Sequence, residues 1–420
     1  MQSLIELIMN RLFAFVWLVA IGTNGVEYYS QEAPYEGALI LVGAVYFLIV
    51  FRLELLRLVF YKDYLLVLSM IVLPFLLMLL SDRSFERGAY TSQIFVLLIF
   101  VVASVLALHA DLDGPLPIAA FVIVAVGAAL NLYELLVANN VWSTAPGRSA
   151  GFYLNANKSG EALLGYGLVF LTARAAKLRI VDLILTALVV VGVFTTFSRA
   201  GILASLVLIP AAALMRTQRK RRLRVVIGGV VMSVLAFAFA SFVLTNMDLS
   251  KDAQLRIESL LRGGGISDYE QARGSATSGA LDVIGEYPLF GAGVNTIYDM
   301  PGGQGPHNMF LAMMVDYGIG GLVLYLVVII RLILSARHAD RDLSAGAWLY
   351  VAWLVIFSIV SHDLLARTST IPLMGFALAR AFQIELLRKE RRLVSDPSRQ
   401  FQRTSGSDRM ALTTLNCHDS

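Results

Sequence analysis

The chain has 420 residues, of which 57% are hydrophobic and 15% are charged, and its formal net charge is +4. Ordinary globular domains carry roughly 25% charged residues, so this composition excludes a soluble enzyme, a nucleic-acid-binding domain and a disordered chain. The only cysteine, Cys417, lies in a polar C-terminal segment, which excludes an internal disulfide and a CxxC metal site.

The apolar runs predict the helices in chain order. The runs cover residues 11–23, 37–51, 64–80, 91–108, 116–137, 159–173, 180–197, 200–215, 225–245, 308–330, 345–361 and 371–387. The segment before the first run carries Glu6 and one basic residue, Arg11, so we expect a retained first helix and not a signal peptide. Because a membrane-spanning helix needs about 20 apolar residues, the pattern predicts an all-α integral membrane protein with about 12 transmembrane helices.

Basic residues predict the orientation in the membrane. Lys and Arg crowd the connection between the runs 200–215 and 225–245, and a second cluster follows the last run. Cytoplasmic loops carry an excess of these residues, so we expect both termini inside the cell and residues 246–307 outside. The expected domains are helices 1–9 in residues 1–245, an outer loop domain in 246–307, helices 10–12 in 308–387 and a disordered cytoplasmic tail in 388–420.

The long outer connection has its own helical pattern. Lys251–Arg262 places its apolar residues on one helical face, and Ser275–Tyr287 predicts a second helix that ends before Pro288. Three consecutive glycines, Gly263–Gly265, separate the two segments. We therefore expect two surface helices that pack over the outer mouth of the bundle.

One histidine is a candidate for proton transfer. His307 lies at the predicted start of the run 308–330, on the outer side. An imidazole is the side chain best suited to proton transfer near neutral pH. The alternative is a structural histidine that hydrogen-bonds a loop carbonyl at the helix start.

Several cations are predicted on the same side, although outer loops are generally poor in Lys and Arg. They are Arg148 and Lys158 in the connection 138–158, Arg199 between the runs 180–197 and 200–215, and Arg256, Arg262 and Arg273 in the long connection. Such a group fits a phosphate or pyrophosphate, which arginine binds with two parallel hydrogen bonds. The alternative is that each arginine snorkels to the surface or pairs with a nearby Asp or Glu.

Known cofactor motifs are absent from the sequence. It contains no P-loop, HExxH, GxSxG or carboxylate-rich metal cluster. We therefore expect no metal and no cofactor.

Together these features resemble the signature of the O-antigen ligase and polymerase superfamily (WaaL and Wzy types). The resemblance rests on Pro288-Leu-Phe-Gly-Ala-Gly293, His307-Asn308 and Gly318-Ile-Gly-Gly321. It also includes Arg199 in an SRAG segment, the region of Asn157, and an arginine upstream of the turn, and it covers roughly residues 145–325. In the family this arginine often stands in an RxxxL motif, which occurs here at Arg256–Leu260. Arg273 lies closer to the turn. Both arginines therefore remain candidates.

The resemblance implies an inverting glycosyltransferase of the bacterial inner membrane that needs neither metal nor nucleotide sugar. It would take a glycan from undecaprenyl pyrophosphate at the periplasmic face and pass it to lipid A–core, with no nucleic acid involved. His307, Arg273 and Arg199 would be catalytic, and Arg148, Lys158, Asn157, Arg256 and Asn308 would bind substrate. A polymerase that extends lipid-linked repeat units is the first alternative. A secondary transporter is the second, although the sequence shows no inverted repeat.

Overall fold

The protein is all-helical throughout the described residues. The computed structural model describes residues 4–25, 28, 35–59, 61–80, 87–109, 115–138, 141–173, 180–216, 228, 251–262, 267–293, 296–298, 305–337, 341–365 and 367–395. These residues form helices and turns, and none of them forms a strand. The expected all-α architecture is confirmed for this part of the chain.

The helices follow the apolar runs of the sequence. They are α1 (Leu4–Gly22), α3 (Tyr35–Val50), α4 (Arg52–Val59), α5 (Lys62–Leu80), α6 (Arg87–Leu108), α7 (Pro115–Tyr133) with the π-helical turn η2 (Glu134–Ala138), η3 (Gly151–Tyr153), α8 (Ala156–Ala173), α9 (Ile180–Thr195), α10 (Arg199–Arg216), α12 (Lys251–Arg262), α13 (Ser267–Glu286), η5 (Thr296–Tyr298), α14 (Met309–Arg337), α15 (Arg341–Val360) and α16 (Ile371–Ser395). The predicted run 225–245 lies outside the described residues apart from position 228.

Three elements differ from the prediction. The short helix α4 is not predicted by the apolar runs, because its sequence, RLELLRLV, mixes charged with apolar residues. Helix α13 begins at Ser267 and not at Ser275, since the polar residues that follow the glycine break continue the same helix. Helix α16 continues to Ser395, so residues 388–395, expected to belong to a disordered tail, are helical and carry the C-terminal basic cluster.

Two helices in the described part are long and apolar enough to cross a membrane. They comprise Pro115–Val137 and Met309–Arg337, and shorter apolar helices of 10–17 residues accompany them. Large apolar side chains also face outward along the helices, for example Ile49 and Leu203, which are 66% and 64% exposed. The fully buried core between the helices contains Trp17, Tyr166 and Phe357.

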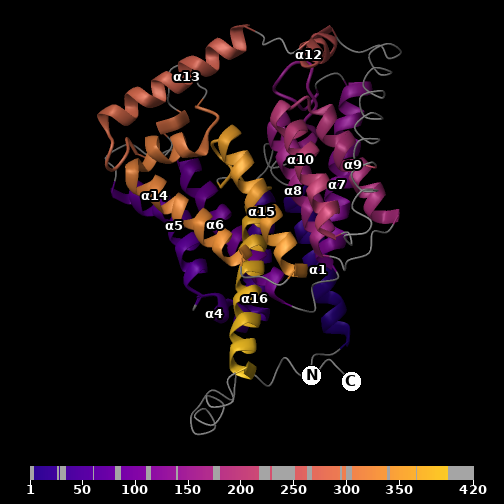
Figure 1. The fold of residues 1–420 in the computed structure, drawn as a ribbon, viewed down its shortest axis with the longest axis vertical. Coiled ribbons are helices and arrows are strands. Elements are labelled where there is room, and N and C mark those ends of the chain that lie inside the picture. Colours follow the sequence, from indigo (N-terminus) through magenta and orange to yellow (C-terminus); the bar gives the residue numbers. More distant parts are fainter. Residues whose placement is uncertain are drawn as a thin grey trace.

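The two ends of the helix bundle carry different elements. Helices α12 and α13 lie at the upper end in Figure 1, and α16 ends at the lower end. Helix α13 packs on the start of α14 through Ala280, Ala312 and Val315. Both segments that were expected to be helical within the long connection do form helices. That they cover the outer mouth of the bundle stays a prediction.

The turn after α13 is fastened to a kink in α14. Gly318 interrupts α14 with φ +63°, and at this point the Ile319 amide donates to the Pro288 carbonyl at 2.9 Å. The Ala292 amide donates to the Val315 carbonyl at 2.8 Å. A Cβ atom on Gly291, whose φ is +73°, would lie 2.4 Å from the backbone of Asp316. The glycines of the PLFGAG and GIGG segments thus allow two backbones to touch, which fixes the turn after α13 against α14.

Replacing Gly318 by alanine is expected to destabilise this junction. The new Cβ would lie 2.3 Å from the Leu289 carbonyl oxygen, and a positive φ disfavours any residue with a Cβ. We expect Gly318→Ala to melt at a lower temperature in detergent. Gly320→Ala is the matched control, because a Cβ atom added at Gly320 would meet open space and alanine is the better helix former. Equal melting temperatures for the two variants would contradict the proposed role of the kink.

Candidate functional site

A buried glutamate organises the segment that follows α7. The Glu134 carboxylate is 1% exposed and accepts four backbone N–H groups. One oxygen accepts from Trp142 at 2.8 Å and Ser143 at 2.5 Å, and the other accepts from Ala150 at 2.7 Å and Gly151 at 2.9 Å. A buried charge needs partners of this kind. They hold both ends of the segment together and so position the arginine between them.

That arginine, Arg148, is directed into the bundle. Its side chain is 9% exposed, and its Nε donates to the Thr196 carbonyl at 2.9 Å, while a terminal nitrogen donates to Asn157 Oδ1 at 2.7 Å. Asn157 Oδ1 also accepts from Ser198 Oγ at 2.9 Å. The connections before α8 and before α10 are therefore joined through Arg148 and Asn157, both of which the sequence placed among the substrate-binding candidates.

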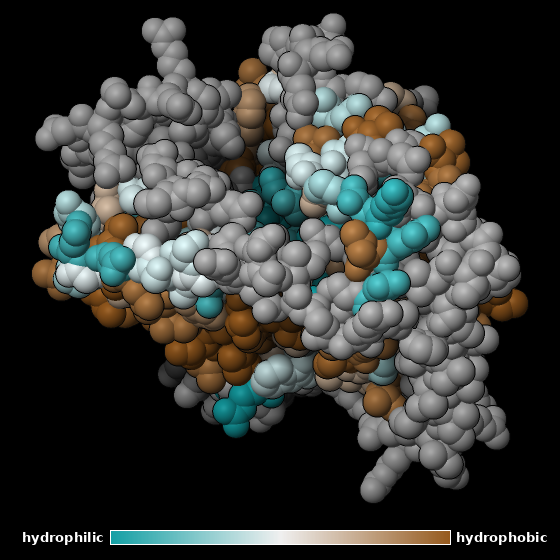
Figure 2. All heavy atoms as spheres, turned by 90° about the horizontal axis from the view of Figure 1, so that it is seen from above, coloured by the Kyte–Doolittle hydropathy of each residue, from teal (hydrophilic) through white to brown (hydrophobic). Residues whose placement is uncertain are grey.

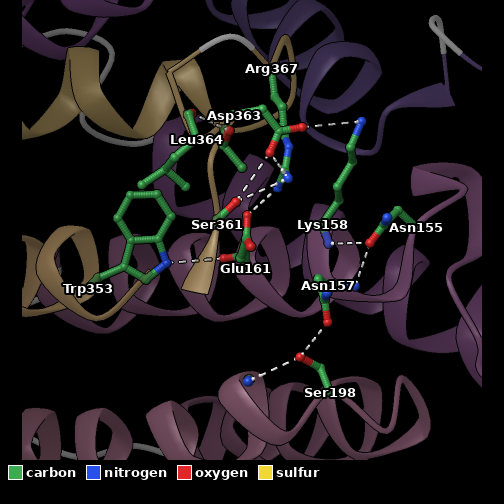
Figure 3. A network of polar contacts seen from close by, with 12 residues as sticks. Asn155, Asn157, Lys158, Glu161, Ser198, Trp353, Ser361, Asp363, Leu364 and Arg367 are labelled. Carbon is green, nitrogen blue, oxygen red and sulfur yellow. Dashed lines mark hydrogen bonds and ion pairs between the residues drawn. The ribbon is translucent and has the colours of Figure 1, made fainter. Parts of the chain in front are cut away.

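A second group of charges lies one turn further along α8, where α8 meets the connection between α15 and α16 (Figure 3). Arg367 forms ion pairs with Glu161 and Asp363, and it donates to Ser361 Oγ at 3.1 Å. The side chains of Arg367, Glu161 and Asp363 are all less than 10% exposed. Lys158 lies 3.8 Å from Asp363 and keeps 30% of its side chain exposed. We call these four residues, Lys158, Glu161, Asp363 and Arg367, the ion-pair cluster.

The ion-pair cluster sets the protonation of its neighbours. Burial by itself would raise the pKa of Asp363, but Arg367, His362 and Lys158 hold that pKa well below its usual value. Burial lowers the pKa of His362, and Arg367 and Lys158 act in the same direction against the opposing effect of Asp363. At neutral pH, Asp363 is therefore ionised and His362 is a neutral imidazole that can accept a hydrogen bond or a proton.

His307 lies beside this group. Its ring centroid is 5.4 Å from that of His362, with the two rings inclined at 58°. The residue that caps α14 is its neighbour Asn308, whose Oδ1 accepts from the Phe310 and Leu311 amides at 2.9 and 3.2 Å. The structure thus gives Asn308, expected to bind substrate, the role of a helix N-cap. His307 is not the side chain that caps these amides.

The remaining arginines lie at the same end of the bundle. Arg199 begins α10 directly after Ser198 and is exposed. Arg256 lies on α12 and Arg273 on α13, and their side chains lie outside the described part of the chain. Helix α12 touches the segment after α7 that Glu134 holds in place, because a Cβ atom on Gly147 would lie 2.4 Å from the backbone of Asp252. Seen from above, hydrophilic atoms lie in a hollow near the middle of this face (Figure 2).

Four residues of the candidate site are not indicated by the apolar runs or by the resemblance. They are Glu161 on α8 and His362, Asp363 and Arg367 in the connection between α15 and α16. A signal is nevertheless present, since SHDLLARTST is a polar break between two apolar runs and contains one of only five histidines. This segment lies outside the long connection and outside the motifs of the resemblance, so neither of them indicates it. Among the described residues, no group of three or more His, Cys, Asp and Glu side chains could hold a metal ion.

The fold and the site define a class. Apolar helices, two of them long enough to cross a membrane, carry a polar, charged site where several helix connections meet at one end. Such an arrangement is typical of an integral membrane protein that handles a polar ligand at the membrane surface.

The comparison with known protein families finds a match over part of the chain. Residues 184–326 match the O-antigen ligase family, which confirms the resemblance to the O-antigen ligase and polymerase superfamily. The match extends from α9 into α14 and contains Arg199, His307 and the PLFGAG turn. No curated protein matches the chain significantly. A chain in a solved structure, titled "Structural coordination of polymerization and crosslinking by a peptidoglycan synthase complex", aligns with a TM-score of 0.45 and 17% identity over 76% of this chain and 96% of that chain.

Proposed function

We propose that the protein is an O-antigen ligase of the bacterial inner membrane that transfers a glycan from undecaprenyl pyrophosphate to lipid A–core at the periplasmic face. Members of the matched family are membrane glycosyltransferase-like enzymes that use lipid-linked glycans. The observation that carries the proposal is the position of His307, which lies within the matched region and against His362 beside the ion-pair cluster. A candidate base and a set of fixed cations therefore meet at one end of the membrane helices.

The orientation is part of the proposal. Four connections contribute to the site: those before α8, before α10, before α14 and before α16. Each lies an even number of predicted spans from the next, so all four fall on one side of the membrane. The basic residues at the end of α16 lie at the opposite end of the bundle in Figure 1. The rule that cytoplasmic segments are rich in Lys and Arg therefore favours a periplasmic site and cytoplasmic termini.

In the proposed transfer step, His307 and the cations of the site have separate roles. The acceptor hydroxyl oxygen attacks the anomeric carbon and its proton passes to His307, while the bond from that carbon to the pyrophosphate oxygen breaks. Undecaprenyl pyrophosphate leaves with the bonding electrons, and a single displacement inverts the anomeric carbon. Arg199 and Arg273 stabilise the leaving charge, and Arg256 and the partly exposed Lys158 add positive charge nearby. Arg148 and Asn157 act by holding the start of α8 in place.

Reconstitution separates the proposed function from its alternatives. The purified full-length protein would be placed in proteoliposomes with undecaprenyl-pyrophosphate-linked glycan and lipid A–core, without added metal or nucleotide sugar. We expect the glycan to appear covalently on lipid A–core, detected as a mobility shift on gels. Longer glycans that remain on undecaprenyl pyrophosphate would instead identify a repeat-unit polymerase. Movement of the lipid-linked glycan across the membrane without a new bond would identify a transporter.

A further inference from the structure

The corner between α13 and α14 exposes an unusual group of apolar side chains. Tyr287, Leu289 and Phe290 are 51%, 63% and 83% exposed. We call residues 287–290 the apolar corner. Phe290 is the most exposed of the large hydrophobic side chains in the described residues. A water-facing loop of a membrane protein gains nothing from such a group, so its exposure requires a partner.

The apolar corner is held firmly in this position. The Gly291 amide donates to the Tyr287 carbonyl at 3.1 Å, which closes the turn. The Pro288 carbonyl accepts from the Ile319 amide at 2.9 Å, and the Leu289 carbonyl packs against Gly318, where no Cβ atom fits. Because both sides of the turn are fastened to α14, Leu289 and Phe290 cannot fold back into the core without breaking these contacts.

The apolar corner continues an exposed apolar surface of α14. Beyond the kink, α14 exposes Ile319, Val323 and Ile330, which are 46%, 50% and 52% exposed. These residues lie on Met309–Arg337, one of the two helices long and apolar enough to cross a membrane. The hydrogen bond between Pro288 and Ile319 places the corner beside the first of them. In Figure 1 the C-terminal end of α13 lies at the left edge of the molecule, and Figure 2 shows hydrophobic atoms beside hydrophilic ones along that edge.

We propose that the apolar corner is inserted into the lipid bilayer at the boundary between headgroups and acyl chains. Leucine and phenylalanine side chains are favourably buried among acyl chains, and a tyrosine at the same level places its hydroxyl among the headgroups. The partner is therefore membrane lipid. The consequence is that α13, which carries Arg273, is tied to the membrane surface at its C-terminal end and is held over the site. This inference depends on membrane insertion and not on the reaction that the protein catalyses.

Site-directed spin labelling tests the lipid contact in the intact chain. Cys417 is replaced by serine, and single cysteines are introduced as Phe290→Cys and Leu289→Cys in full-length protein in lipid nanodiscs. Two reference positions calibrate the scale: Ser278→Cys, an exposed polar site on α13, and Val323→Cys, an exposed apolar site on α14. Each label is measured for collisions with molecular oxygen, which concentrates in lipid, and with a water-soluble nickel chelate.

We expect labels at positions 289 and 290 to resemble the label at 323, with more oxygen than nickel collisions, and to differ from the label at 278. A pattern like that at position 278 would show that the corner faces water and would overturn the inference. Low accessibility to both reagents would also overturn it, because the corner would then be covered by protein, either a second copy or another chain. Transfer activity is not the readout, so this result stands apart from the test of the proposed ligase.

Discussion

His307→Ala is expected to lose transfer activity by roughly 10²–10⁴-fold, the usual contribution of a positioned acid or base. The reason is that the imidazole is the group proposed to take the proton from the acceptor hydroxyl, while the cations hold the pyrophosphate. Binding of the lipid-linked donor should therefore remain close to that of the wild type. The measurement is the initial rate of glycan transfer to lipid A–core per folded molecule, together with donor affinity for the same preparation.

The control for this variant is His109→Ala. His109 directly follows α6 and packs on Phe51 with a ring-centroid distance of 4.4 Å, at the end of the bundle opposite His307. It should keep its activity per folded molecule even if the yield falls. Asn308→Ala shows the effect of a loss of stability alone at the start of α14. It removes the N-cap of α14 and is expected to cost about 1 kcal/mol of stability. If His307→Ala transfers glycan within a few-fold of the wild-type rate, His307 has no part in the proton transfer.

Arg367→Ala is expected to produce the largest loss of stability. Glu161 and Asp363 would remain buried without their main cation, and breaking a buried ion pair in this way typically costs about 3–5 kcal/mol. The connection between α15 and α16 would lose its attachment to α8, and His362 would no longer be held beside His307. Thermal unfolding in detergent measures the effect, and a sharp fall in the yield of folded protein is expected with it.

Two comparisons show whether burial is the cause. Lys389→Ala removes an exposed ion pair with Glu385 at 3.1 Å, one turn apart on α16, and such pairs contribute only roughly 0.3–0.5 kcal/mol. The triple variant Arg367→Met, Glu161→Gln, Asp363→Asn removes all three charges together, so it should be more stable than Arg367→Ala. If Arg367→Ala shifts the melting temperature as little as Lys389→Ala does, the ion-pair cluster does not hold this end of the bundle together.

The helices of this protein are largely predictable from the sequence. Helix formation depends on local periodicity, so the apolar runs predict nearly every helix in the described part, and the glycine and proline signals locate the corner at Pro288. The charged helix α4 and the extension of α16 to Ser395 are not predicted, because they are not apolar. The resemblance indicates Arg199, His307 and the PLFGAG turn, which lie within the matched region.

The tertiary structure decided which polar residues meet. The sequence by itself determined an all-helical chain with apolar helices, a long polar connection and one marked histidine at a helix start. It did not reveal that Arg367 pairs with Glu161, 206 positions earlier, that Arg148 and Asn157 bind each other, or that Asn308 is engaged as a cap. The physical reason is that a helix is encoded by neighbours along the chain, whereas a buried ion pair depends on how distant helices pack. Only that packing brings the ring of His362 to a centroid distance of 5.4 Å from that of His307 and so assembles the candidate site.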